Sequence, residues 1–134
     1  TFENALHGKC IITPHLGEFT RLWPKISWDD KVRAAGEAAR KTGAVALLKG
    51  PDTVISDGKT TVINTHASAD LATAGAGDVL CGIIAAFLAQ GAAPLSAAAI
   101  GAWVHGDAAI RLGRGLISED LVEAISKTLK GLAK

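Results

Sequence analysis

In the first half of the chain, short apolar runs alternate with stretches whose apolar residues recur at helical spacing. An apolar run that stops at Pro14, and another that stops at Lys49-Gly50-Pro51, predict buried strands. Two runs rich in β-branched residues flank Asp57-Gly58 and predict a hairpin with a two-residue turn of positive φ. The strands expected are therefore residues 9–13, 44–48, 53–56 and 59–63.

Helical signals lie between these strands. A short helix is expected over residues 17–23, before Pro24. A longer one is expected to begin at Ser27 as N-cap, with acidic residues in its first turn, and to end at Gly43. The residues that fall on one face of the longer helix at the required spacing, and are expected to face the core, are Val32, Ala35, Gly36 and Ala39.

The second half of the chain predicts a loop and three helices. Residues 64–77 are small or polar and indicate the loop. Residues 78–90 are apolar nearly all round a helix, so that helix is expected to be buried and to end at Gly91. Further helices are expected from Pro94 to about Leu112 and, with caps at Ser118, Glu119 and Asp120, to about Leu129. The residues of the last helix expected to face inward are Leu121, Val122, Ile125 and Leu129.

Strands followed by helices predict an α/β fold with a mostly parallel sheet and an attached antiparallel hairpin. The three C-terminal helices are expected to pack on the faces of this sheet. About four strands make a small sheet for so many alanine-rich helices, so further strands are expected upstream and the chain is expected to be a partial domain. It begins with Thr1 rather than Met, which favours a processed chain or a segment of a longer one.

Composition narrows the function classes. Of the 134 residues, 49% are hydrophobic and 20% charged, which supplies a core and argues against disorder. The formal net charge is +1 and no basic block exceeds two residues, so we expect no binding to nucleic acid or to an anionic membrane surface. The longest apolar run, residues 79–89, is too short to span a bilayer. Cys10 and Cys81 are expected to be free thiols in a reducing compartment.

The segment richest in chemical information is residues 72–80, ATAGAGDVL. Small residues before an apolar helix let the backbone approach a ligand closely. We expect the N–H groups of Gly75, Ala76, Gly77 and Asp78 to be unpaired, so that with the helix dipole they form an anion pocket. Beside a phosphate, Asp78 would be repelled unless it takes a proton from an attacking hydroxyl, as a general base does. On spacing alone, the favoured alternative is a tight turn with Asp78 as an ordinary cap.

Residues 70–85, DLATAGAGDVLCGIIA, resemble the signature of the ADP/ATP-dependent NAD(P)H-hydrate dehydratases, which are ribokinase-like proteins often fused to an epimerase domain. The Gly-Ala-Gly-Asp core is shared with the wider superfamily, whereas its flanks single out this branch. Residues 13–19 resemble the family's TPHxGE motif and residues 47–58 its LKGxxT…DG hairpin. Residues 103–107 and 115–121 fit its C-terminal helices. The resemblance covers essentially all of this chain but only the second half of the family's domain.

The resemblance implies a ribokinase-like, Rossmann-like fold in which residues 1–134 are the C-terminal portion of a dehydratase domain. It implies a cytoplasmic repair lyase in which ADP or ATP phosphorylates the ring hydroxyl of hydrated NADH or NADPH, after which phosphate leaves. Asp78 would be the catalytic base and would bind substrate together with His15. The backbone of Gly75, Ala76 and Gly77 would form the anion hole. The nucleotide would be held by Lys49, Gly50, Pro51, Asp52, Thr53 and Gly77, with Thr53 as hydroxyl donor.

The resemblance also bears on cofactors and partners. Mg²⁺ would neutralise the phosphates without a dedicated protein cage. A homo-oligomer is expected, because the exposed sheet edge needs covering. Many family members have Thr where this chain has Ala76, which removes one side-chain hydrogen bond to phosphate but leaves the backbone donors.

Two other functions stay open at this point. A ribokinase-like kinase for a vitamin or sugar would keep Asp78 but stop after phosphorylation, and His15 argues against it. A non-catalytic nucleotide-binding module is compatible with the short chain, and catalysis by this segment alone is not expected. The residues with a structural interpretation are Glu18 as cap or surface charge, Lys49 as solvated charge, Cys81 as core residue, Trp23, Trp28 and Trp103 as packing anchors, and His105 and Asp107 as a buried pair satisfied by neighbouring backbone.

Overall fold

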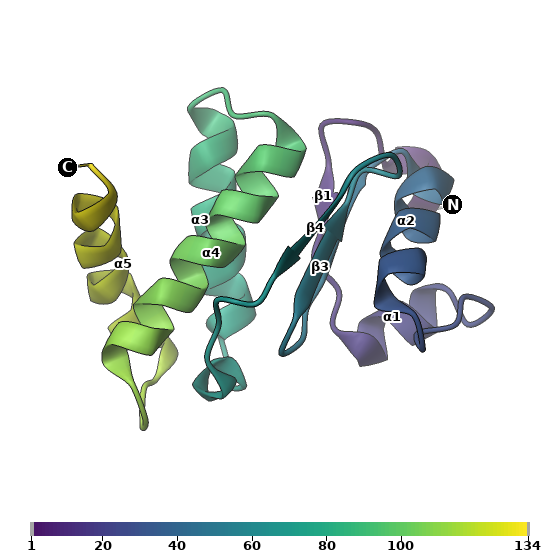
Figure 1. The fold of residues 1–134 in the computed structure, drawn as a ribbon. Coiled ribbons are helices and arrows are strands. Elements are labelled where there is room, and N and C mark those ends of the chain that lie inside the picture. The colour runs from purple at the N-terminus through teal and green to yellow at the C-terminus, as the bar shows by residue number, and fades with distance from the viewer. Residues whose placement is uncertain (1, 134) are drawn as a thin grey trace.

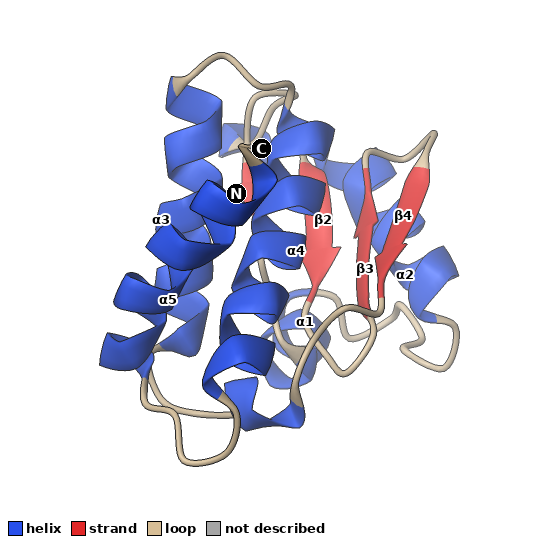
Figure 2. Ribbon diagram, turned by 60° about the vertical axis from the view of Figure 1, so that its left-hand side comes forward, coloured by secondary structure: helices blue, strands red, loops and turns tan. Residues whose placement is uncertain are grey.

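Four short strands form one sheet in the order β1–β2–β3–β4 in the computed structural model, which describes residues 2–133 (Figures 1 and 2). Their bounds are β1 Ile11–Ile12, β2 Val45–Leu48, β3 Thr53–Ser56 and β4 Thr61–Asn64. β1 runs parallel to β2, whereas β2–β3 and β3–β4 pair antiparallel. The sheet of this segment is therefore mixed, where the sequence predicts a mostly parallel one. The reason is that short loops join β2 to β3 and β3 to β4, and such loops can connect only antiparallel neighbours.

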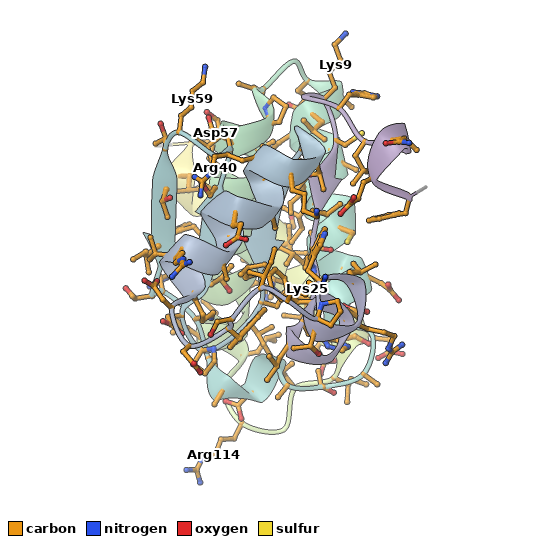
Figure 3. The ribbon with its side chains drawn as sticks, turned by 90° about the vertical axis from the view of Figure 1, so that its right-hand side faces the viewer. Lys9, Lys25, Arg40, Asp57, Lys59 and Arg114 are labelled. Atoms are coloured by element: carbon orange, nitrogen blue, oxygen red, sulfur yellow. The ribbon has the colours of Figure 1, made fainter. Side chains whose placement is uncertain are left out.

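The β3–β4 hairpin closes through a longer loop than predicted. Ser56 pairs with Thr61, so the loop is residues 57–60 rather than two residues. The Asp57 carboxylate accepts from the backbone N–H groups of residues 59 and 60, at 2.9 and 2.7 Å, and stabilises the wider loop. Gly58 has the expected positive φ, +90°. Arg40 donates to its carbonyl at 3.1 Å, and Figure 3 shows Arg40 beside this end of the hairpin.

Five helices and two 3₁₀ turns complete the described residues. The bounds are η1 Phe2–Ala5, α1 Leu16–Leu22, α2 Lys31–Thr42, η2 Ala69–Leu71, α3 Ala76–Ala89, α4 Pro94–Leu112 and α5 Ser118–Leu132. The predicted bounds of α4 are confirmed, with Gly113 as its C-cap. Among the described residues, no helix has both the length and the apolar character that crossing a bilayer requires.

Helix α2 begins later than predicted. Its N-cap is Asp30, whose carboxylate accepts from the N–H of Arg33 at 3.0 Å, whereas the Ser27 hydroxyl accepts from the Asp29 N–H before the helix. Asp is as good an N-cap as Ser, so two candidates three residues apart compete. The predicted end at Gly43 is confirmed, with φ +72°. Val32 is exposed instead of facing the core, and the inward positions are Ala34, Ala35, Gly36, Ala38, Ala39 and Thr42.

The elements stack in layers, which Figure 1 shows edge-on. Helices α1 and α2 cover one face of the sheet, where Phe19 packs among Trp23, Trp28 and the alanines of α2. Helices α3 and α4 cover the other face through Leu80, Ile84 and neighbouring alanines. Helix α5 packs on α3 and α4 instead of the sheet, because those two helices already fill that face. The prediction that all three C-terminal helices lie on the sheet is therefore wrong for α5.

Helix α3 is buried on one side only. Leu80, Ile83 and Ile84 face the core, whereas the opposite side is open. The residues exposed along that side are Cys81, Gly82, Ala85, Ala86 and Ala89. The prediction of a helix buried all round, with Cys81 in the core, is wrong, and the Cys81 sulfur instead lies 3.4 Å from the Thr13 hydroxyl. An all-apolar helix carries no polar stripe to tell which side faces inward.

Helix α5 also differs from its predicted inward face. Leu121 is buried as expected, but Val122 and Leu129 are exposed. Ala124 and Thr128 take the inward positions. Thr128 is buried because its hydroxyl has a partner on α4, an interaction that the apolar pattern of α5 does not reveal.

Candidate active site

The start of α3 leaves some of its backbone donors free. Gly75 is the N-cap with φ +84°, a left-handed conformation that suits glycine, and a Cβ there would lie 2.8 Å from the Ser118 hydroxyl. The N–H of Ala76 donates to residue 73 and that of Asp78 to Gly75, so the expectation of four unpaired amides is wrong for these two. The N–H groups of Gly75 and Gly77 have no acceptor among residues 2–133. An anion hole built from these amides remains a prediction, with fewer donors than expected.

Asp78 does not cap the helix. It stands third in α3, where a capping carboxylate would accept from the N–H of the N-cap residue, and no such bond forms. Within the described part of the chain, its side chain makes no hydrogen bond and no ion pair. The side chain is exposed and borders a cavity. The ordinary capping interpretation therefore does not describe this carboxylate.

A first cavity of about 540 Å³ lies between the sheet's end, the start of α3 and the middle of α4. It is lined by seven of the predicted site residues, His15, Lys49, Gly50, Pro51, Thr53, Ala76 and Gly77. The other predicted nucleotide residue, Asp52, lies outside this lining. Its carboxylate accepts from Lys31 at 3.2 Å, and this hydrogen bond lowers its pKa below the ordinary value. The Thr53 hydroxyl donates to the Gly50 carbonyl at 3.3 Å, so its donor is already in use.

A second cavity of about 460 Å³ borders Asp78. Thr13, Glu18 and Cys81 also line it. Lys49 and Gly77 line both cavities, so the two spaces meet at these residues. The Lys49 ammonium lies so close to the Gly77 backbone that a Cβ on that glycine would be 3.2 Å from it. A cation and a free N–H group thus stand together where the two cavities join.

The motif at the start of α1 holds His15 and Lys49 in place. His15 Nδ1 accepts from the N–H of Glu18 at 3.2 Å, and the Glu18 carboxylate accepts from the N–H of His15 at 2.9 Å. This reciprocal pair is a capping box, which confirms Glu18 as a structural cap. The bond from the His15 backbone is the main cause that lowers the pKa of Glu18. The same carboxylate lies 3.8 Å from the Lys49 ammonium and so orients the lysine as well.

Two buried polar residues on α4 have opposite surroundings. Asp107 accepts from Arg111 at 2.6 Å and from Thr128 at 2.7 Å, and pairs with His66 at 3.1 Å. Burial raises its pKa, but these three hydrogen bonds outweigh that effect and bring the pKa to about 2. His105 Nε2 is also buried and has no partner. Burial lowers the pKa of His105 to about 4 although a hydrogen bond with the Ala76 backbone raises it, and the charge of Lys49 acts in the same direction as burial.

The prediction that neighbouring backbone satisfies both residues is wrong for Asp107, which side chains satisfy. His105 has a hydrogen bond with the Ala76 backbone, whereas its Nε2 atom has no partner in the described residues. His66, in the loop after β4, does not line either cavity. Its ring stacks on Trp103, with centroids 4.8 Å apart, and the following loop passes over Gly106, where a Cβ would lie 1.8 Å from the His66 carbonyl oxygen.

The sequence model that describes the NAD(P)H-hydrate dehydratase family matches residues 3–130. The chain belongs to this family. An ADP-dependent (S)-NAD(P)H-hydrate dehydratase from Cenarchaeum symbiosum is 37% identical over 133 residues, which cover 93% of this chain and 46% of that protein. A bifunctional NAD(P)H-hydrate repair enzyme from Moorella thermoacetica is 42% identical over 137 residues, which cover 94% of this chain and 26% of that enzyme. This dehydratase-family chain thus spans about a quarter to a half of these relatives.

Solved structures agree with the family assignment. The ADP/ATP-dependent NAD(P)H-hydrate dehydratase of Bacillus subtilis, crystallised with ATP and Mg²⁺, superimposes with a TM-score of 0.83 at 28% identity, over 90% of this chain and 47% of that one. A ribokinase-like superfamily protein from Enterococcus faecalis V583 gives 0.80 at 26% identity, over 92% and 45%. The predicted ribokinase-like α/β fold class is therefore confirmed for this dehydratase-family chain.

The sequence did not predict all the residues that line the first cavity. Asn64, Ser68, Thr73 and His105 line it alongside the predicted residues. His105 stands in a segment, residues 103–107, that resembles the family, but its position in an otherwise apolar helix favoured a structural role. No cluster of three or more His, Cys, Asp or Glu side chains able to hold a metal occurs within residues 2–133.

Proposed function

We propose that this chain is the nucleotide-binding and phosphoryl-transfer portion of an ADP- or ATP-dependent NAD(P)H-hydrate dehydratase. The observation that carries the proposal is the Asp78 carboxylate, which has no partner among residues 2–133 and borders a cavity at the start of α3. A carboxylate without a capping role beside free amides and a lysine is the arrangement that a base for phosphoryl transfer requires. The family to which the chain belongs, and the names of its relatives, support the same chemistry.

The two cavities divide the reaction between them. The first, bordered by Lys49, Gly50 and Pro51, takes the nucleotide, and the second, bordered by Asp78, takes the hydroxyl of the hydrated nicotinamide ring. The terminal phosphoryl group then crosses where the cavities meet, beside the Lys49 ammonium and the Gly77 N–H group. His15 lines the first cavity and its capping partner Glu18 lines the second, so His15 contacts the part of the substrate that reaches the junction of the two cavities.

In the first step, the ring hydroxyl oxygen forms a bond to the terminal phosphorus and the bond from that phosphorus to the bridging oxygen breaks. Asp78 receives the hydroxyl proton, and the nucleotide leaves as AMP or, if ATP is used, as ADP. In the second step, the ring C–O bond breaks and inorganic phosphate leaves. A proton is lost from the neighbouring ring carbon, and the electron pair of that C–H bond forms the C=C bond that restores NADH or NADPH. Lys49 and the Gly77 N–H stabilise the phosphoryl oxygens, so catalysis rests on position and electrostatics.

Mg²⁺ fits this arrangement through phosphate oxygens and water rather than through a protein cage. Asp78 and Glu18 are carboxylates that line the adjoining cavity and would meet the ion through water. When bound, Mg²⁺ would neutralise phosphate charge.

We also propose that this segment is the C-terminal portion of a ribokinase-like domain. The open side of α3 and the outer edge of β1, which pairs with β2 alone, are surfaces that a further part of the domain would cover. The proposal also includes a homo-oligomer in the cytoplasm. Hydrogen exchange of the α3 amides in the intact protein and in this segment tests the first point, since slower exchange in the intact protein is expected. Light scattering of the intact protein tests the second.

The decisive experiment is an assay of the intact protein with hydrated NADPH and ADP or ATP. The expected result is recovery of NADPH absorbance together with stoichiometric release of phosphate. Nucleotide-dependent phosphorylation of a vitamin or sugar hydroxyl, with no NADPH recovery, would instead establish a kinase. Nucleotide binding without turnover of either kind would establish a binding module.

A further inference from the structure

Lys31, the first residue of α2, is held against the loop that joins β2 to β3. Its ammonium donates to the backbone carbonyl of Asp52 and, at 3.2 Å, to the carboxylate of the same residue. The ammonium is also so close to Gly50 that a Cβ on that glycine would lie 2.6 Å from Nζ. Only 16% of the Lys31 side chain is exposed. One lysine thus contacts two residues of a loop that lies 19 or more positions further along the chain.

The stability of α2 does not explain a lysine at this position. The start of a helix carries partial positive charge, so an ammonium there is less favourable than a neutral or acidic group. Partial burial of the ammonium adds a cost of desolvation. The contacts between Lys31 and the loop are the features of the structure that offset both costs.

The loop that Lys31 contacts forms one wall of the first cavity. Lys49, Gly50 and Pro51 all belong to the lining of this cavity. Lys31 itself lines neither cavity. A ligand in the first cavity therefore meets the loop and not Lys31, so any effect of Lys31 on that ligand passes through the loop.

Two other contacts hold the rest of the loop. At its start, the Lys49 ammonium lies 3.8 Å from the Glu18 carboxylate. Next to its end, the Thr53 hydroxyl donates to the Gly50 carbonyl at 3.3 Å. Neither contact reaches the last residue of the loop, which Lys31 holds. A loop that is fixed before its ligand arrives loses less conformational freedom on binding, and this raises affinity.

The position of Lys31 is itself supported by the core. Its Nζ lies 5.7 Å from the centre of the Trp28 ring, and Trp28 packs edge-on against the buried Phe19 with centroids 4.9 Å apart. The charge of Lys31 is balanced by Asp52, whose pKa is lowered chiefly by the hydrogen bond from this lysine. A balanced charge contributes little attraction for phosphate at a distance, so the contacts favour a role in fixing the loop.

We propose that Lys31 is a positioning residue for the nucleotide, which holds residues 49–52 in the conformation that lines the first cavity. This inference rests on the proposed function, because it takes the nucleotide to bind in that cavity. Asp52 then acts through Lys31 rather than by direct contact with the nucleotide. Neither residue takes part in the proton transfer assigned to Asp78.

The test compares Lys31→Met with Lys31→Arg in the intact protein, by steady-state kinetics with hydrated NADPH at varied ADP. Met keeps the length of the side chain and removes its charge and donors, whereas Arg keeps both. We expect Lys31→Met to raise the KM for ADP about three- to tenfold and to change kcat less than about twofold, because the binding wall is loosened while the base is intact. Lys31→Arg should restore the KM to within about twofold of the unmodified protein.

A control and a second substitution sharpen this comparison. Lys41→Ala, which removes a lysine paired with Glu3 outside both cavity linings, should leave the KM for ADP unchanged. If Asp52 acts only through Lys31, the double variant Lys31→Met, Asp52→Ala should have the same KM as Lys31→Met, within about twofold. Multiplied effects in the double variant would instead show an independent contact of Asp52 with the nucleotide and would overturn the inference.

An unchanged KM for ADP in Lys31→Met, or an equal rise in Lys31→Met and Lys31→Arg, also overturns it. If Lys31→Met does not fold, Asp52→Ala replaces it, because that side chain is 58% exposed. A rise in the KM of about two- to fivefold is then expected, and an unchanged KM overturns the inference. If the unmodified protein turns over hydrated NADPH with ADP and the variants keep its KM, this inference alone fails. If the unmodified protein neither binds nor uses a nucleotide, the proposed function fails with it.

Discussion

Two regions of the molecule meet on α4, and they differ in whether their buried polar groups have hydrogen-bond partners. On the side toward α5 and the loop after β4, Asp107 is held by Arg111, Thr128 and His66. On the side toward the first cavity, His105 Nε2 has no partner. Only one residue separates His105 from Asp107 in the chain. The difference in their hydrogen-bond partners therefore comes from the tertiary structure around each of them.

The difference separates structural polar groups from functional ones. In the Asp107 region both carboxylate oxygens are paired within the protein, which joins α4 to α5 and to the loop that carries Ala67 and Ser68 to the cavity wall. Around the two cavities, the Gly77 N–H group, the Asp78 carboxylate and His105 Nε2 have no hydrogen-bond partner within residues 2–133. Unsatisfied polar groups that gather in one place indicate a ligand site, whereas satisfied ones indicate stability.

The largest expected effect is a loss of activity when the Asp78 carboxylate in the cavity region is removed. In the intact protein, Asp78→Asn should lower turnover of hydrated NADPH by about 10²–10⁴-fold, because the base is lost. Nucleotide affinity and the free energy of unfolding should change little, because the carboxylate has no internal partner. Steady-state kinetics and denaturant unfolding measure these effects. Asp29→Asn, at an exposed site outside both cavity linings, is the control, and equal loss of activity in both variants would refute the assignment.

The opposite outcome is expected for Asp107→Ala. Removal of this carboxylate leaves the buried Thr128 hydroxyl without its partner, and an unsatisfied buried polar group destabilises a protein by about 1–3 kcal/mol, whereas the half-exposed Arg111 charge is solvated. Urea unfolding of the intact protein measures the change. If stability falls by less than about 1 kcal/mol, Asp107 is not the structural counterpart that the comparison requires.

The third prediction is that the His105 and Asp107 regions lose stability in different pH ranges. The folded-state pKa of His105, about 4, lies below its ordinary 6.5, so the unfolded chain takes up that proton first. Its contribution to stability is therefore present above pH 6.5 and is lost as the pH falls toward 4, by on the order of 3 kcal/mol. Asp107, with a pKa lowered from 3.8 to about 2, contributes stability that is lost only between those two values. The free energy of unfolding is measured at a series of pH values. The loss of stability between pH 6.5 and 4 should be absent in His105→Phe and present in Asp107→Asn.

A smaller effect is expected from Lys49→Ala. Loss of a charged hydrogen bond to phosphate should weaken ADP binding by about 1.5–3 kcal/mol, whereas stability should change by less than about 1 kcal/mol because the pair with Glu18 is partly exposed. Lys41→Ala is the matched control, since Lys41 also pairs with an acid, Glu3, at 3.8 Å but lines neither cavity. Calorimetric titration of both variants with ADP measures the difference. The same affinity in Lys49→Ala as in Lys41→Ala would remove Lys49 from the site.

Local chemistry in the sequence determined the elements and most of the site's components. Pro94 and Gly113 bound α4, Gly43 ends α2, and the motifs at residues 13–19, 47–53 and 72–80 supply much of the first cavity's lining together with Asp78. Caps, helical period and turn residues act over a few positions, so they can be read from the chain.

Only the tertiary structure decided which polar groups have hydrogen-bond partners within the protein and which have none. It turned Asp52 toward Lys31, left one side of α3 open, placed α5 in an outer layer and gave Asp107 partners from positions 66 and 128 while giving His105 Nε2 none. An all-apolar helix looks the same from every side, and partners distant in the chain leave no local signal. Burial and hydrogen-bond satisfaction are properties of the packed molecule, and for this reason the roles of His105 and Asp107 differ although both stand in the same helix.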